Sequence, residues 1–278
     1  MIVGNVQYIG KSLFHDVALP DRIVKVKRND WLVVELNKCR ELVDTGNFMP
    51  DEDTQKLFEQ FSGIHDKKII DGMLTGKRCF LIGSGSSLKG FDFSRLDKEF
   101  TIAINHTILY YPKAFSNIFL DGIFLDKNNN EARVVLKNYK GMIFCSFRTQ
   151  YQKENLNAIP FYVNNDKVQK KFNKGLWGAR LTGLAAISLA IIMNAEKIYL
   201  LGYDMNKHAT NLHFYDENGK AKYNNDKGYR GERISSNILA FKQFIDYKDK
   251  IINLNPKSEI PYFSRMTIDE VLNETPSK

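Results

Sequence analysis

From about residue 77 onward, the chain alternates short apolar runs with longer stretches of helical length. Six runs fit buried strands, namely Cys79–Ile82, Phe100–Ile104, Asn117–Leu120, Gly141–Cys145, Lys197–Leu201 and Ile251–Leu254. Two longer stretches fit helices, Thr182–Asn194 and Ser235–Tyr247. Continuous apolar strands that alternate with helices are typical of a parallel sheet covered on both faces. We therefore predict an α/β fold, a Rossmann-like, mostly parallel sheet with helices on both faces, plus a small N-terminal module.

The first part of the chain lacks this alternation. We interpret residues 1–75 as a small accessory module and residues 76–278 as a Rossmann-like nucleotide-binding catalytic domain. Within the module, partial alternation predicts two short strands, and apolar residues at helical spacing predict two helices. These elements are expected at Val3–Ile9, Arg22–Lys27, Trp31–Leu42 and Asp51–Phe61.

Composition narrows the class of protein. The 278 residues are 43% hydrophobic and 26% charged, which is ordinary for a globular chain. No apolar run reaches the roughly 18 residues of a membrane span, and no secretory signal is visible. Three widely spaced cysteines suit a reducing compartment, so we expect a cytoplasmic protein. The formal net charge of +8 favours anionic partners such as nucleotides or nucleic acid.

Polar residues follow four of the predicted strands, where open α/β sheets bind their ligands. The segment after the first strand combines glycines, which let backbone approach an anion closely, with serine hydroxyls and amides that bind phosphate. Turn formation or helix capping is the simpler role for each residue. The set expected to line a nucleotide site is Gly83, Ser84, Gly85, Ser86, Ser87, Asn105, Asp121 and Asp204.

The start of the long apolar helix adds a second group that recognises anions. Thr182 can cap this helix, and Gly183 lets a ligand come near its positive end. Arg180 beside them can clamp a phosphate or carboxylate with two hydrogen bonds. We include all three residues in the nucleotide or donor site.

Two residues are candidates for the general base. Glu232 follows Tyr229 in a glycine-flanked polar loop, where it fits either an ion-pair cluster with its flanking arginines or a base in a cleft. His213 is the other candidate. His208 and His213 have no third ligand at a zinc-like spacing, so we propose no structural zinc.

Several of these segments resemble the bacterial lipooligosaccharide sialyltransferases. The resemblance covers residues 77 to about 256 and rests on Ile82–Lys89, Asp92–Leu96, Arg180–Gly183 and Lys197–Asp204. It implies a glycosyltransferase that moves a sugar from a nucleotide-sugar donor to an acceptor hydroxyl and needs no metal cofactor. In that alignment Glu232 stands where the family has its general-base histidine, and Tyr229 falls in the same loop.

The same segments also resemble the neighbouring 6-hydroxymethylpterin diphosphokinase-like proteins, which are often phage-borne. That resemblance implies transfer of pyrophosphate from ATP with Mg²⁺, held in this chain by Asp121 and Asp204. A third hypothesis is a non-catalytic phage or surface-associated protein that retains the fold. The expected partners are a nucleotide or nucleotide-sugar, an acceptor glycan or a nucleic acid, and a second copy of the chain in a homo-oligomer.

Overall fold

The computed structural model of the chain describes most of the predicted catalytic domain and parts of the N-terminal module. The described residues are 3–8, 14–18, 23–35, 42, 48–50, 52, 70–121, 130–146, 156, 158–178, 181–206, 213–215 and 227–273. The chain forms two compact units, Met1–His65 and Asp66–Lys278, which we treat separately. Among the described residues, no helix combines the length and the hydropathy needed to span a membrane.

The described part of the first unit consists mainly of antiparallel strands. Its strands are β1 (Val3–Tyr8), β2 (Phe14–Ala18), β3 (Ile23–Lys27), β4 (Trp31–Glu35) and β5 (Phe48–Pro50). They form one sheet in the order β4-β1-β5 and one hairpin of β2 with β3. Val6 is fully buried, and the rings of Tyr8 and Phe48 lie 5.1 Å apart, so alternate residues of β1 face the core. The strands expected at Val3–Ile9 and Arg22–Lys27 are confirmed.

The helix expected at Trp31–Leu42 is wrong for residues 31–35; of the rest, the structure describes only Leu42, which is helical. Residues 31–35 form β4, which pairs with β1 in antiparallel register from Gln7–Trp31 to Val3–Glu35. Trp, Leu and two adjacent β-branched valines favour a strand, and the pairing with β1 outweighs their helical spacing. Apart from Glu52, the helix expected at Asp51–Phe61 lies outside the described residues.

An eight-stranded parallel sheet forms the centre of the second unit. Its strands are β6 (Arg78–Ile82), β7 (Phe100–Ile104), β8 (Ser116–Phe119), β9 (Met142–Ser146), β10 (Ala158–Phe161), β13 (Lys197–Leu201), β14 (Ile251–Asn253) and β15 (Ser264–Arg265). Their order is β10-β9-β8-β7-β6-β13-β14-β15. Six of these strands were predicted from their apolar runs, and most of their residues are buried, as expected for a parallel sheet with both faces covered.

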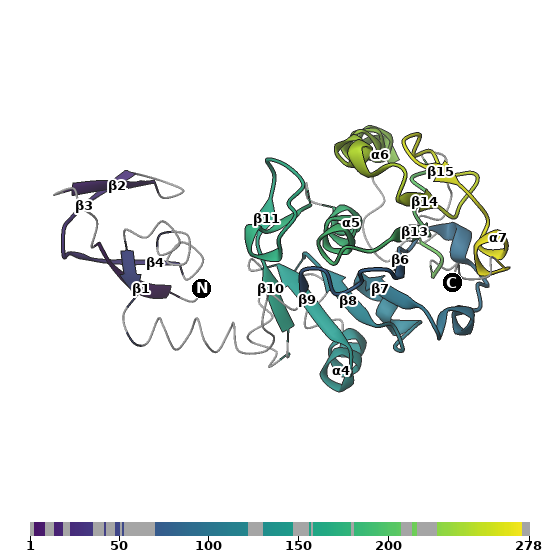
Figure 1. Cartoon of the computed structure of the whole chain (residues 1–278), viewed down its shortest axis with the longest axis horizontal. Helices are drawn as coiled ribbons and strands as arrows, with labels where there is room; N and C mark the ends of the chain where they lie inside the picture. Colours follow the sequence, from purple (N-terminus) through teal and green to yellow (C-terminus); the bar gives the residue numbers. More distant parts are fainter. Residues whose placement is uncertain are drawn as a thin grey trace. The chain divides into compact units, whose positions relative to one another are not determined.

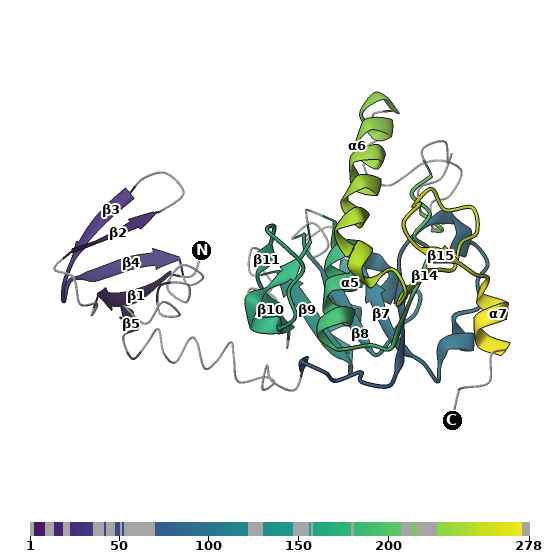
Figure 2. The ribbon, with the colours of Figure 1, turned by 45° about the horizontal axis from the view of Figure 1, so that its top comes forward.

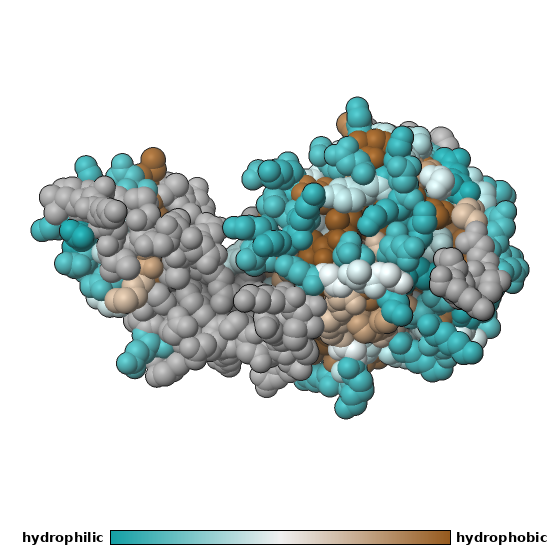
Figure 3. Space-filling view, viewed as in Figure 1, coloured by the Kyte–Doolittle hydropathy of each residue, from teal (hydrophilic) through white to brown (hydrophobic). Residues whose placement is uncertain are grey.

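Helices cover both faces of this sheet, which confirms the predicted α/β class. Figure 1 shows α5 (Thr182–Ile192) and α6 (Lys227–Ala240) on one side and α4 (Asn130–Asn138) on the other. Nearly every residue of α5 is buried, whereas α6 extends beyond the rest of its unit (Figure 2). Leu239 on α6 is 63% exposed, and apolar side chains show among hydrophilic ones around α5 and α6 in Figure 3.

Several short elements of the second unit have no clear sequence signal. They are β11 (Val163–Asn164), β12 (Leu176–Trp177), β15, α7 (Ile268–Asn273) and the 3₁₀ helices η1 (Ser86–Leu88), η2 (Phe93–Leu96), η3 (Asn105–Leu109) and η6 (Phe172–Lys174). The 3₁₀ helix η7 (Phe241–Tyr247), by contrast, lies within the helix predicted at Ser235–Tyr247. The edge strand β10 was also missed, because Pro160 interrupts its apolar run. Proline is tolerated at a sheet edge, where it need not donate to a further strand.

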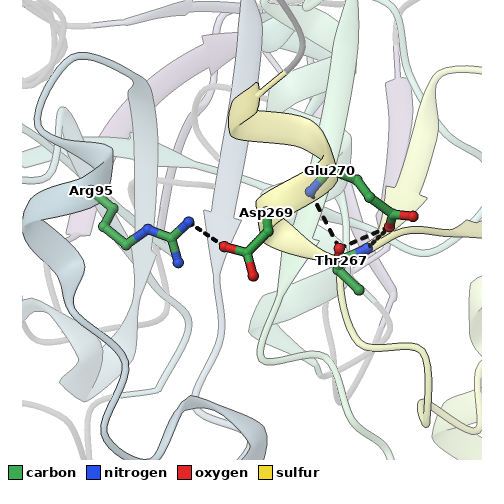
Figure 4. Close-up of polar contacts among 4 residues, drawn as sticks. All are labelled: Arg95, Thr267, Asp269 and Glu270. Carbon is green, nitrogen blue, oxygen red and sulfur yellow. Dashed lines mark hydrogen bonds and ion pairs between the residues drawn. The ribbon is translucent and has the colours of Figure 1, made fainter.

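The C-terminal helix α7 is fastened to the body of the second unit. Thr267 and Glu270 form a reciprocal capping box: the Thr267 amide donates to the Glu270 carboxylate at 2.6 Å, and the Glu270 amide donates to the Thr267 hydroxyl at 3.3 Å (Figure 4). Arg95 on η2 pairs with Asp269 at 2.6 Å. The Arg95–Asp269 ion pair joins α7 to the segment that follows β6.

Residues 70–75 belong to the second unit, although we expected them in the N-terminal module. Ile70 and Leu74 are fully buried in the core of the second unit. The amide of Leu74 donates to the carbonyl of Met193 at the end of α5, at 2.7 Å. The boundary between the units therefore lies before residue 70.

Candidate functional site

The strand order reverses between β6 and β13. From β6 the chain adds β7, β8, β9 and β10 successively on one side, and then returns to place β13 on the other side of β6. The loops that follow β6 and β13 therefore leave the same edge of the sheet next to each other. In open α/β sheets, a reversal of this kind opens the crevice in which ligands bind.

The loop Gly83–Ser87, which follows β6, packs tightly against the loop that follows β13. The Gly83 and Gly85 amides donate to the carbonyls of Leu201 and Gly202 at 2.8 and 2.9 Å. A Cβ atom on Gly83 or Gly85 would lie 2.7 or 2.6 Å from the Gly202 carbonyl oxygen. We expected these glycines to let backbone approach a phosphate, but in the structure they let two loops approach each other.

Asp204, which follows β13, holds the Gly83–Ser87 loop through hydrogen bonds. Its carboxylate accepts hydrogen bonds from the Ser87 amide at 2.8 Å and the Ser87 hydroxyl at 2.5 Å. The Ser86 hydroxyl and the Asn255 side-chain amide donate to the same carboxylate at 3.4 and 2.8 Å. Asp204 is 8% exposed, so these four donors occupy most of its acceptor sites.

His213 meets the same loop from another direction. Its Nδ1 atom lies 2.8 Å from the Ser84 hydroxyl oxygen. The amide of Phe214 donates to the Ser84 carbonyl at 2.9 Å, and His213 forms an isolated antiparallel bridge with Gly85. Ser84 and His213, two predicted site residues 129 positions apart, are thus brought together.

Aromatic rings stack beside His213. The ring of Tyr215 lies parallel to that of His213, with centroids 5.1 Å apart and an angle of 12°. The ring of Tyr110, just after η3, stacks on Tyr215 at 5.3 Å and 6°. Phe214 meets Tyr110 edge-on at 4.9 Å. The sequence analysis missed these rings, although the run of three aromatic residues from His213 to Tyr215 was a signal for them.

Asn105 lies at the end of β7, beside the Gly83–Ser87 loop. The Thr107 hydroxyl donates to the Gly83 carbonyl at 2.9 Å, which ties η3 to this loop. The fully buried Asn117 donates through Nδ2 to the carbonyls of Ala103 and Asn105 at 2.9 and 3.3 Å. Asn105 therefore lies at the predicted edge, as the first residue of η3.

Strained backbone occurs at the same edge of the sheet. Asn105 and Met205 both have positive φ angles, of 50° and 49°. The left-handed conformation costs a residue that has a side chain about 1–2 kcal/mol. Asparagine tolerates this conformation more readily than methionine does. Such strain persists where the surroundings hold it, often at binding sites.

The N-terminal end of α5 also reaches this edge. The Tyr203 hydroxyl donates to the Gly183 carbonyl at 3.0 Å, and a Cβ atom on Gly183 would lie 3.0 Å from the Tyr203 ring. Burial raises the pKa of Tyr203 well above its usual value, so the hydroxyl stays protonated and donates. Thr182 is the first residue of the helix and not its cap, since Leu181 occupies the capping position without a side-chain bond.

The structure does not bring the remaining predicted site residues into this group where it describes them. Asp121 follows β8 and is exposed. Tyr229 and Glu232 lie on α6, but their side chains fall outside the described residues, as does the whole of Arg180. Among the described residues, no cluster of three histidine, cysteine or acidic side chains suits a metal ion.

One cavity lies away from this edge. It has a volume of about 430 Å³ and is bordered by Ala114 and Gly141, which precede β8 and β9, and by Val134 and Tyr139 in and after α4. It therefore opens near the amino ends of the strands, and no predicted site residue is among the described residues that line it. We do not associate it with the candidate site.

Comparison with known proteins adds no family or fold relative. No protein-family model, no curated protein and no solved structure matches the chain significantly. The resemblance to sialyltransferases and to diphosphokinase-like proteins therefore stays a prediction.

Proposed function

We propose that the chain is a nucleotide-sugar-dependent glycosyltransferase whose site lies where the strand order reverses between β6 and β13. The observation that carries the proposal is the contact of Ser84 with His213 at that reversal. This contact supports the proposal because His213 can move a proton and lies at the edge where Rossmann-like sheets bind nucleotides. The sugar-transfer chemistry itself rests on the sequence resemblance to sialyltransferases.

The negative groups of the donor would face the start of α5. The amides of Gly83, Gly85 and Ser87 already donate to protein acceptors, so they contribute less to phosphate binding than the sequence suggested. The first turn of α5, with Thr182 and Gly183, offers amides and the positive end of an 11-residue helix. In this proposal that turn stabilises the phosphate as it leaves.

His213 is the base in this proposal. It would take the proton of an acceptor hydroxyl while that oxygen forms a bond to the donor's anomeric carbon. The bond from that carbon to the phosphate oxygen breaks, and the nucleotide leaves with the electron pair. We prefer His213 to Glu232 because His213 contacts the Gly83–Ser87 loop through Ser84.

The Mg²⁺-dependent alternative needs Asp121 and Asp204 as metal ligands, and these two residues do not suit that role together. The Asp204 carboxylate already accepts four hydrogen bonds. Asp121 and Asp204 follow strands that are three spacings apart in the sheet, about 14 Å, whereas Mg²⁺ binds ligands at about 2 Å. We therefore derive no step through Mg²⁺ held by this pair.

Calorimetric titration of the full chain with CMP, UDP, GDP and ATP tests nucleotide binding. We expect one nucleotide to bind with measurable heat. Absence of binding by all four to folded protein would overturn the proposal and favour the non-catalytic alternative. A preference for ATP without hydrolysis of any nucleotide-sugar would favour pyrophosphate transfer.

Hydrolysis of nucleotide-sugars tests the chemistry. CMP-, UDP- and GDP-sugars are incubated with the protein, and released nucleotide is measured by chromatography. We expect the His213→Gln variant to lose about 10²–10⁴-fold in rate. The matched control is His15→Gln in the first unit, which should retain the full rate.

A further inference from the structure

The His213 ring is held by two independent contacts. Within its plane, Nδ1 lies 2.8 Å from the Ser84 hydroxyl oxygen. Across its plane, the ring stacks on Tyr215, which in turn stacks on Tyr110. A hydrogen bond restricts rotation of the ring about its own bond, and a parallel neighbour restricts its tilt. The imidazole is thereby fixed before any substrate arrives.

From this geometry, and resting on the proposed function, we infer that Ser84 and Tyr215 are positioning residues for His213. Ser84 accepts the Nδ1 proton and so selects the tautomer in which Nε2 carries the lone pair. Tyr215 sets the direction in which Nε2 points. The acceptor's proton then goes to Nε2, and neither Ser84 nor Tyr215 contacts the reacting atoms.

The role of the Ser84 hydroxyl sets which ring nitrogen is protonated. In histidines that act as bases or ligands, the hydrogen bond made by one ring nitrogen sets the protonation of the other. A serine hydroxyl can accept the Nδ1 proton or donate to a bare Nδ1, and the 2.8 Å contact fits both directions. We take Ser84 as the acceptor, which makes Nε2 the nitrogen that exchanges a proton with substrate, and the tautomer measurement below decides between the two.

Ser84 is a rigid partner because its loop is fixed on both sides. Its own carbonyl accepts the Phe214 amide at 2.9 Å. The flanking Gly83 and Gly85 amides donate to the loop that follows β13, and Asp204 holds the next two serines. A hydroxyl on such a backbone keeps its position, which a positioning role requires.

The tautomer is measured directly by NMR on protein labelled with ¹⁵N-histidine. Protonated and unprotonated ring nitrogens have well-separated ¹⁵N shifts, and the His213→Gln spectrum assigns the signal among the five histidines. At a pH where all imidazoles are neutral, we expect His213 to carry its proton on Nδ1. Ser84→Ala should shift the population toward the Nε2-protonated form.

Matched variants separate positioning from general damage. Ser264→Ala makes the same change at an exposed position of β15, outside the candidate site, and should leave the tautomer unchanged. Tyr215→Phe keeps the stack and should behave as wild type. Tyr215→Leu removes it and should broaden the His213 signals.

Activity gives an independent measurement. If a nucleotide-sugar is hydrolysed, Ser84→Ala should lower kcat by about 10–100-fold and leave the donor KM unchanged. This loss is smaller than that from removing the general base itself, because Ser84 only positions the base. An Nε2-protonated His213 in the wild type, or equal behaviour of Ser84→Ala and Ser264→Ala, would overturn the inference. Labelling of Ser84 by a fluorophosphonate would do so too, because it would make Ser84 a nucleophile. Absence of hydrolysis with the expected tautomer would instead overturn the proposed function alone.

Discussion

The two anchors of the Gly83–Ser87 loop differ in kind. Asp204 is 8% exposed and accepts hydrogen bonds from three residues of the surrounding loops. His213 is half-buried and touches the loop through a contact with Ser84, with Tyr215 stacked on its ring. A side chain most of whose acceptor sites are used inside the protein stabilises it. A half-buried imidazole held at the edge where the strand order reverses is suited to contact a substrate.

This comparison reverses part of the sequence interpretation. Asp204 looked like a ligand for a substrate or a metal because it follows a strand. The structure makes it the support of the loop, and His213 becomes the better candidate for contact with substrate. The following variants test that division, from the largest expected effect to the smallest.

Gly85→Ala should have the largest effect on stability. Its Cβ would lie 2.5 Å from the Asp204 carboxyl carbon and 2.6 Å from the Gly202 carbonyl oxygen, so one of the two loops must move. We expect the free energy of unfolding to fall by more than about 3 kcal/mol, measured by urea denaturation. Gly178→Ala is the control, because its nearest contacts would be ordinary at 3.5 Å. Equal stability of the two variants would contradict the close packing of the loops.

Asp204→Asn should be the next most harmful change. Asparagine has the same size as aspartate. Its NH₂ group, however, would face at least one of the hydroxyl or amide groups that donate to the Asp204 carboxylate in the structure. The expected loss of stability is about 2 kcal/mol, with the loop disturbed. Asp249→Asn, an exposed carboxylate in the turn before β14, is the control and should change stability by less than about 0.5 kcal/mol. If Asp204→Asn were as stable as wild type but did not bind nucleotide, Asp204 would be a ligand after all.

His213→Gln should cost little stability. Glutamine can still hydrogen-bond to Ser84, and the main loss is the stacking on Tyr215, which is worth about 1 kcal/mol or less. Its thermal midpoint should therefore lie close to that of wild type, while donor hydrolysis is lost. A loss of stability as large as that of Asp204→Asn would make His213 a second structural anchor and remove the contrast.

The sequence predicted the strands and the residues at the edge of the sheet well. It predicted less well which side chains contact one another within the site. Apolar runs that end in polar residues are local signals, so β6, β7 and β13 and the residues that follow them were found. The contact of Ser84 with His213 joins positions 129 apart and depends on the loops around it. The same limit explains the error at Trp31, where local spacing indicated a helix and pairing with a distant strand decided the structure.

We expect the smallest effect on stability from a change in the capping box of α7, where the carboxylate is exposed and not buried. Like Asp204, Glu270 accepts a backbone amide and a hydroxyl, both from Thr267, but it is exposed (Figure 4). These bonds hold the pKa of Glu270 below its usual value. Because the folded-state pKa is lowered, the stabilisation is present above the unfolded-state pKa and is lost as pH falls through the folded-state value. Glu270→Gln should thus be slightly less stable than wild type at neutral pH, and the difference should shrink in acid. Unfolding curves across that pH range check it, and a difference that grew on acidification would mean that the carboxylate destabilises the helix.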